Sequence, residues 1–163
     1  MTKKKKVKLS EIETKDTPDC IILHILSFLN AKHAVQTCIL STRWNNLWKL
    51  LPALRFDSTD FRFYTKFTKF VSKVLSLRNS SVKLQALEFN SNASRLEFLL
   101  LKRIVNYAIS HNVQLLGLCS YTEIEYIPPS MFSCQSLTHL KLCTYPNGGH
   151  ETLSKIFQFA GIN

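Results

Sequence analysis

The chain has 163 residues, of which 45% are hydrophobic and 20% are charged, with 4 Gly and 5 Pro. This composition excludes a wholly disordered or collagen-like chain and leaves room for one large domain or two small ones. No glycine precedes Gly117, so residues 1–116 hold no glycine-rich phosphate-binding loop. The motifs G-x-S-x-G, H-E-x-x-H and C-x-x-C are absent as well. We therefore expect no enzyme active site, no metal site and no cofactor.

Positive charge dominates the sequence: 21 Lys and Arg against 11 Asp and Glu give a formal net charge of +10. Residues 3–8 hold five lysines, and residues 43–83 hold nine basic side chains against two acidic ones. Such an excess favours an acidic partner or nucleic acid. We interpret residues 1–16 as a disordered basic tail, with a nuclear-import signal as the alternative.

The sequence carries no signal for a membrane or for secretion. No segment approaches the roughly 20 apolar residues that span a bilayer. Four acidic residues separate the lysine run from the next apolar run, and no small-residue cleavage site follows, so the start is not a signal peptide. The five cysteines are irregularly spaced, as in a reducing compartment. We expect an intracellular protein of the nucleus and/or cytoplasm.

Three short helices are predicted in residues 17–52. Thr17 as a cap and Pro18 at the first helical position favour the start of the first helix. Asn30 is the predicted cap of the second helix, and Ser41 begins the third. The helices offer more apolar surface than they can bury against one another. We therefore expect a neighbour or a partner to cover the remainder.

Residues 53–163 alternate between predicted strands and predicted helices. Strands are predicted at residues 54–56, 82–89, 113–119 and 137–143. Helices are predicted at residues 60–78, at 94–110 after a capping box from Ser94 to Glu97, and at 151–159, with a helical turn near 131–134.

The predicted helix 60–78 carries two stripes. The apolar stripe consists of Phe63, Phe67, Phe70, Val74 and Leu77. The basic stripe lies one position earlier, about 100° around the helix, and consists of Arg62, Lys66, Lys69 and Lys73. We interpret the basic stripe as a solvated face; nucleic acid or an acidic degron are the alternatives.

A repeated pattern, L-x-x-L-x-L with other apolar residues allowed, accompanies each predicted strand. It occurs at residues 51–56, 84–89, 113–118 and 137–142, at intervals of 33, 29 and 24 residues. Repeats of 20–29 residues, each a strand followed by a helix, are typical of leucine-rich repeats. Because one such unit cannot bury its apolar face alone, we expect the units to stack in parallel.

Residues 18–48 resemble an F-box. The motifs are P-D at Pro18–Asp19, H-I-L-S-F-L at His24–Leu29, and L-S-x-R-W-x-x-L-W at Leu40–Trp48. Nearly the whole chain past residue 16 is similar to plant F-box proteins with leucine-rich repeats. This resemblance implies an α+β to α/β fold. A three-helix F-box at residues 17–52 would precede a short, incomplete leucine-rich-repeat solenoid of parallel strands and helices at residues 53–163.

The resemblance also implies a function: a substrate-receptor subunit of an SCF-type (cullin–RING) ubiquitin ligase. In such complexes the F-box docks on a Skp-type adaptor, and through it on cullin, and the repeats select a protein for ubiquitination. No catalysis takes place in the receptor chain. Apolar and aromatic anchors dominate such interfaces. We therefore expect the adaptor-facing side to consist of Pro18, Ile21, Leu26, Val35, Leu40, Trp44 and Trp48. For four further apolar residues, a place in the chain's own core and a place in the interface remain equal alternatives: Ile22, Ile25, Leu47 and Leu51.

Three positions depart from the family pattern. Thr17 stands where the family usually has leucine, Asn30 where it has proline, and Thr42 where it has lysine or arginine. A fully buried leucine contributes about 1.5–3 kcal/mol, so its absence predicts weaker docking. Two alternatives remain at this point: a basic nucleic-acid-associated protein, and a degenerate receptor that binds the adaptor but no substrate.

Overall fold

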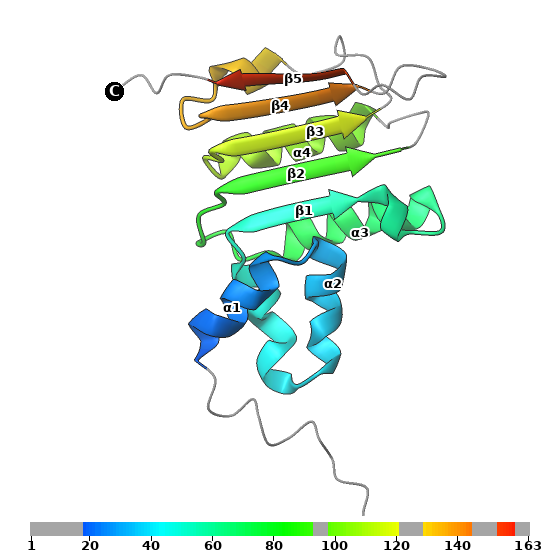
Figure 1. Cartoon of the computed structure of the whole chain (residues 1–163), viewed down its shortest axis with the longest axis vertical. Coiled ribbons are helices and arrows are strands. Elements are labelled where there is room, and N and C mark those ends of the chain that lie inside the picture. Colours follow the sequence, from blue (N-terminus) through cyan, green and yellow to red (C-terminus); the bar gives the residue numbers. More distant parts are fainter. Residues whose placement is uncertain (1–17, 93–97, 121–128, 145–152, 159–163) are drawn as a thin grey trace, which may run out of the picture.

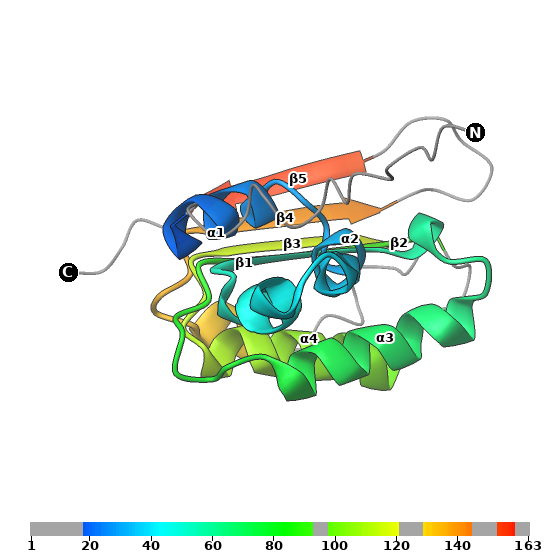
Figure 2. The same cartoon turned by 90° about the horizontal axis from the view of Figure 1, so that it is seen from below.

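The computed structural model describes residues 18–92, 98–120, 129–144 and 153–158. Short N-terminal helices lie below the first strand of a five-stranded sheet, and two longer helices cover one face of that sheet (Figures 1 and 2). The structure is therefore a mixed α/β protein. The predicted tail, the Thr17 cap and the Ser94–Glu97 capping box lie outside the described residues. None of the described helices is long and apolar enough to cross a membrane.

The first two N-terminal helices confirm the prediction, with one shift. Helix α1 is Asp19–Ser27, so Pro18 lies at the N-cap and not at the first helical position; its ψ of 145° is extended. Helix α2 is Ala31–Gln36, and the Asn30 side chain caps it by accepting a hydrogen bond from the backbone N–H of His33 at 2.9 Å.

The predicted third helix is a tighter 3₁₀ helix, η2 (Thr42–Leu50), and the end of the predicted second helix is another 3₁₀ segment, η1 (Thr37–Ile39). The sequence between Thr42 and Asn46 has weak α-helix propensity, and the proline after Leu51 forces that residue out of helical geometry. Leu47 and Trp48 are the buried residues of η2. An i, i+3 apolar spacing suits a 3₁₀ helix as well as an α-helix, so the sequence pattern alone did not separate the two.

The sheet has the strand order β1-β2-β3-β4-β5. Strands β1 (Ala53–Asp57), β2 (Ala86–Ser91), β3 (Leu115–Ser120) and β4 (His139–Thr144) are parallel to their neighbours. Strand β5 (Leu153–Gln158) pairs with β4 in the antiparallel direction. The predicted parallel strands at 54–56, 82–89, 113–119 and 137–143 are thus present, most of them starting a few residues later.

The register of the sheet coincides with the repeat in the sequence. The second apolar position of each unit forms one row across the strands, and the third forms the next: Leu54, Leu87, Leu116 and Leu140, then Phe56, Phe89, Leu118 and Leu142. Both rows are buried, as are the first positions, Leu51, Leu84, Val113 and Leu137. Each L-x-x-L-x-L unit therefore supplies one layer of the core.

Two helices cover the buried face of the sheet. Helix α3 is Tyr64–Leu77 and helix α4 is Phe98–Ser110, and they run side by side (Figure 2). A 3₁₀ turn, η3 (Ser58–Asp60), precedes α3, and another, η5 (Pro129–Ser133), precedes β4. The predicted start of α3 at residue 60 was too early, because Asp57 accepts from the backbone N–H of Thr59 and fixes a turn there.

The buried face of α3 differs slightly from the predicted apolar stripe. Phe67, Val71, Val74 and Leu75 are buried, whereas Phe63 and Leu77 at the two ends are about half exposed. Phe67 stacks against Phe89 of β2, with ring centroids 5.5 Å apart. The buried positions follow i, i+4, i+7 and i+8 spacing, which gives a wider face than the single row predicted from the sequence.

The predicted final helix at 151–159 is wrong, because β5 occupies this part of the chain. Six residues of β5 pair with β4, from Leu153 opposite Thr144 to Gln158 opposite His139. An unpaired strand edge offers a row of backbone donors and acceptors, and these outweigh the weak helix preference of so short a segment.

Arg78 joins the N-terminal helices to the sheet. Its guanidinium is buried after the last residue of α3 and donates to the carbonyls of Leu51 (3.0 Å), Val82 (2.9 Å) and Lys83 (3.2 Å). No carboxylate among the described residues pairs with it. The carbonyl of Leu51 belongs to the end of the N-terminal helices, and the other two precede β2, so one side chain holds three segments together.

Replacement of Arg78 is expected to destabilise the fold strongly. In an Arg78→Met variant the three carbonyls lose their donor, and an unpaired buried polar group costs about 1–3 kcal/mol. We expect the free energy of unfolding, measured by urea titration, to fall by about 3 kcal/mol. The matched control is Arg55→Met, since Arg55 is exposed and forms a surface ion pair that contributes about 0–1 kcal/mol. Equal losses in the two variants would contradict this role of Arg78.

Asn30 is expected to contribute through its side chain, although it departs from the family pattern. Asn30→Ala removes the cap of α2 and the 2.6 Å hydrogen bond from Asn30 Nδ2 to Asp60 Oδ2. A lost cap costs about 1 kcal/mol, which we expect to see as a lower urea midpoint. Asn30→Ser keeps a capping oxygen and should recover most of the loss. A serine variant as unstable as the alanine variant would show that the contact with Asp60 dominates.

Candidate functional site

The structure divides the seven predicted adaptor-facing residues into three groups. Pro18, Ile21 and Leu40 are exposed, and Val35 and Trp44 are partly buried against the core. Leu26 and Trp48, in contrast, are buried in the chain's own core. Both side chains belong to the chain's core cluster of buried residues and have almost no exposed surface. Ile22, Leu47 and Leu51 are buried as well.

Helix α1 presents an apolar stripe to solvent. It consists of Ile21, Ile25 and Phe28, at i, i+4 and i+7, with exposed fractions of 47%, 47% and 70%. Ile22 and Leu26 point the other way, into the core. Sequence reasoning placed Ile21 on this surface, left Ile25 open and omitted Phe28. The i, i+4, i+7 period could have found all three, but five apolar residues in nine made both faces of α1 look apolar.

Two further features shape the surface of the N-terminal helices. Ile39 and Leu40 are exposed after α2, where η1 ends. In the part of the chain that the structure describes, neither Ser41 Oγ nor Trp44 Nε1 has a hydrogen-bond partner, although both atoms are buried. A buried polar atom without a partner is costly, so the start of η2 is the least satisfied part of these helices.

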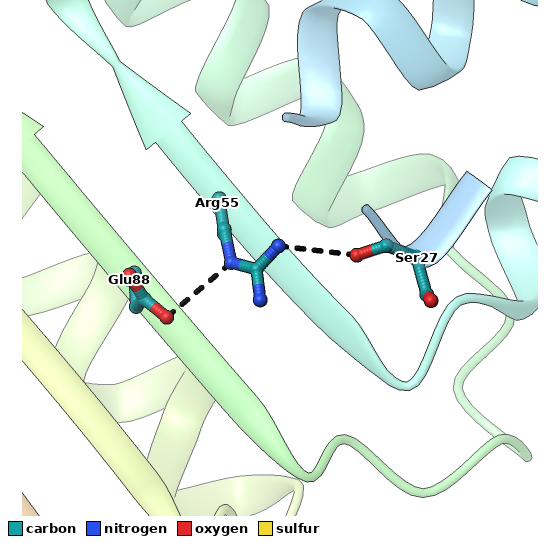
Figure 3. Close-up of polar contacts among 3 residues, drawn as sticks. All are labelled: Ser27, Arg55 and Glu88. Carbon is teal, nitrogen blue, oxygen red and sulfur yellow. Dashed lines mark hydrogen bonds and ion pairs between the residues drawn. The ribbon is translucent and has the colours of Figure 1, made fainter. Parts of the chain in front are cut away.

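Polar contacts fix α1 against the rest of the molecule. Asp19 in its first turn pairs with Arg43 at 2.7 Å. At its other end, the carbonyl of Ser27 accepts from Arg55 of β1 at 3.1 Å, and the same guanidinium contacts Glu88 of β2 at 3.4 Å (Figure 3). The apolar stripe therefore has a defined orientation relative to the sheet.

The sheet face opposite α3 and α4 forms a second candidate surface. Arg55, Glu88, Gly117 and Lys141 occupy one register row on successive strands. They line a groove of about 490 Å³ that extends to Asn30 at the N-terminal helices. A Cβ atom at Gly117 would lie 3.3 Å from Cγ of Glu88, so the glycine gives the Glu88 side chain room beside Arg55. The groove thus offers both signs of charge.

Two thiols lie at the next outward-facing row of this groove. Cys119 of β3 and Cys143 of β4 are register partners on neighbouring strands. Burial, together with the hydrogen bond and the charge of Cys143, raises the pKa of Cys119 to about 12. A thiol with so high a pKa stays protonated near neutral pH and is a poor nucleophile. The described residues contain no group of three or more His, Cys, Asp or Glu that could hold a metal ion.

Comparison with known proteins identifies the N-terminal part of the chain. The F-box domain family matches residues 18–56, which include α1, α2, η1, η2 and most of β1. No solved structure matches the chain significantly.

Curated relatives extend the similarity beyond the F-box. In Arabidopsis thaliana, an FBD-associated F-box protein is 36% identical over 139 residues, covering 82% of this chain and 31% of the relative. F-box/LRR-repeat protein 13 is 34% identical over 131 residues, covering 77% of this chain and 29% of the relative. The chain thus spans about 30% of the length of these relatives. It carries an F-box domain and belongs to the plant F-box/LRR-repeat proteins.

Proposed function

We propose that the chain is the substrate-receptor subunit of an SCF-type (cullin–RING) ubiquitin ligase, whose F-box docks on a Skp-type adaptor. The observation that carries the proposal is the coincidence of the F-box match at residues 18–56 with an exposed apolar stripe on α1. Because a helix that buries one apolar face inside the chain has no structural need for a second one, the stripe is best explained as a surface for a partner.

The proposed adaptor-binding surface combines the stripe with its exposed neighbours in the sequence. Ile21, Ile25 and Phe28 are its centre, and Pro18 and Leu40 are further contacts. Leu26 and Trp48 act indirectly by holding α1 and η2 in place. Asp19 and Arg43, which pair beside the stripe, fit the polar rim that surrounds the apolar centre of protein interfaces.

We assign the sheet and its helices to a leucine-rich-repeat solenoid that recognises the protein to be ubiquitinated. The four repeat units, their parallel register and their shared buried rows support this assignment. The groove on the open face is the proposed contact surface, because Arg55, Glu88 and Lys141 give it charges of both signs. No catalytic step is assigned to this chain, in keeping with the non-catalytic adaptor role of the family.

Removing the stripe should weaken adaptor binding. The double variant Ile21→Ser, Ile25→Ser loses apolar area on side chains that are already about half exposed, so its folding should change little. If burial of each isoleucine contributes about 1 kcal/mol, the affinity for a recombinant Skp-type adaptor falls by about 10-fold to 100-fold. Isothermal titration calorimetry of the purified chain measures this. Substituting Trp48 would not serve, since the loss of a buried tryptophan also destabilises the fold.

Ile156→Ser is the matched control for the double variant. Ile156 is 64% exposed, but it lies on β5, at the opposite edge of the sheet from the N-terminal helices (Figure 1). Its substitution should leave the affinity unchanged. If the wild-type chain fails to bind the adaptor, the ubiquitin-ligase assignment falls. Adaptor binding without any captured protein would indicate the degenerate receptor, and binding of nucleic acid alone would indicate the basic nucleic-acid-associated protein.

A further inference from the structure

A second groove lies on the opposite side of the sheet, between α3 and α4. Its volume is about 550 Å³, and the cations among its lining residues are Lys69, Lys73 and Arg103. No acidic residue is among the described residues that line it. The two helices that form it run side by side (Figure 2). The groove is therefore separate from both the stripe on α1 and the open face of the sheet.

The charge of the two helices is one-sided. Helices α3 and α4 comprise 14 and 13 residues, with five cations (Lys66, Lys69, Lys73, Lys102 and Arg103) and no Asp or Glu. In the described ranges of the chain, Lys69, Lys73 and Arg103 form no ion pair. A solvated helix face usually mixes both signs, because i, i+4 pairs of opposite charge stabilise it. A face of one sign favours an anionic partner.

Small hydroxyl side chains keep the groove open. Thr68, Ser72 and Ser76 recur every four residues along the side of α3 that lines the groove. Thr68 and Ser76 donate to carbonyls of their own helix, at 3.2 and 2.9 Å. Among the described residues Ser72 Oγ has no hydrogen-bond partner, so its hydroxyl is available to donate to an anion. Larger apolar residues at these positions would have closed the space between the helices.

We propose that this groove binds an extended acidic peptide segment of a partner protein, with acidic side chains at alternate positions. Lys69 and Lys73 are one helical step of four residues apart, about 6 Å along the axis. Alternate side chains of an extended peptide are about 6.6 Å apart on one face. Two carboxylates or phosphates in an acid-x-acid order therefore match the two lysines. Arg103 of α4 can hold one of them in a bidentate manner.

The surroundings of the groove favour a peptide over a membrane or nucleic acid. Its cations line a recess between two helices, whereas binding to a flat bilayer requires charges on a protruding surface. Leu99, which is largely exposed, adds an apolar contact beside the cations, and a peptide can supply an apolar side chain there. None of the described residues that line the groove is aromatic, so this part of the groove lacks the stacking contacts that single-stranded nucleic acid uses.

Fluorescence anisotropy of the whole chain tests the proposal. The probe is a labelled nine-residue peptide, Gly-Ser-Leu-Glu-Ser-Glu-Ser-Gly-Ser, and a second peptide has Gln in place of both Glu. We expect the Glu peptide to bind at least about tenfold more tightly than the Gln peptide. A Lys69→Glu, Lys73→Glu variant should lose this preference, because the attractive pairs between lysine and peptide glutamate become repulsive pairs of like charge.

The control variant, Lys66→Glu, Lys102→Glu, has the same change in net charge, with one substitution on each of the helices α3 and α4, but neither residue lines the groove. It should retain the preference within about twofold. Equal loss in both variants, or equal binding of the two peptides, would overturn the proposal. Tighter binding of phosphatidylserine vesicles or of a DNA oligonucleotide than of the Glu peptide would overturn it too, in favour of those partners. The adaptor plays no part in this test, so its outcome is independent of the proposed ligase role.

Discussion

The arrangement of the whole molecule depends on one buried cation, the guanidinium of Arg78. Its charge has no carboxylate partner in the described part of the chain and is solvated by backbone carbonyls. Burying a cation is costly unless its donors are satisfied, so the carbonyls of Leu51, Val82 and Lys83 must stay arranged around it. These carbonyls come from both sides of the junction between the N-terminal helices and the sheet. The junction therefore has one favourable geometry.

A fixed junction fixes the relation between the proposed binding surfaces. Backbone hydrogen bonds from Asn79 to Lys49 and from Gln85 to Pro52 reinforce the same boundary. Arg55 extends the connection across the open face, since it contacts both the end of α1 and Glu88. A receptor that must hold a captured protein at a constant distance from its adaptor benefits from such rigidity, because the position of the captured protein then depends on folding and not on a flexible linker.

The sequence predicted the parts of the structure that a periodic pattern determines. The four L-x-x-L-x-L units predicted the strands and their parallel stacking, because each unit has one apolar face that it cannot bury alone. Sequence patterns were insufficient where contacts with another part of the chain, or with a partner protein, determine the structure of a segment or the burial of a side chain. For residues 153–158 the decisive factor was the open edge of β4, which no local pattern in the segment reveals. For Leu26 and Trp48, apolar character predicted burial correctly but could not tell whether the chain or a partner supplies it.

The net charge of the chain does not show where a partner binds, whereas the fold shows which charged side chains lie together. A net charge of +10 favours anionic partners in general, and the sequence alone is most simply interpreted as placing the lysines of α3 on a solvated helix face. In the fold, Lys69 and Lys73 lie across a recess from Arg103, which is 30 residues further along the sequence than Lys73. Meanwhile Arg55 and Glu88 balance each other on the opposite side of the sheet. The helical face is therefore positive whereas the open face carries both signs, and a strongly acidic partner segment is attracted to the helical face rather than to the open one.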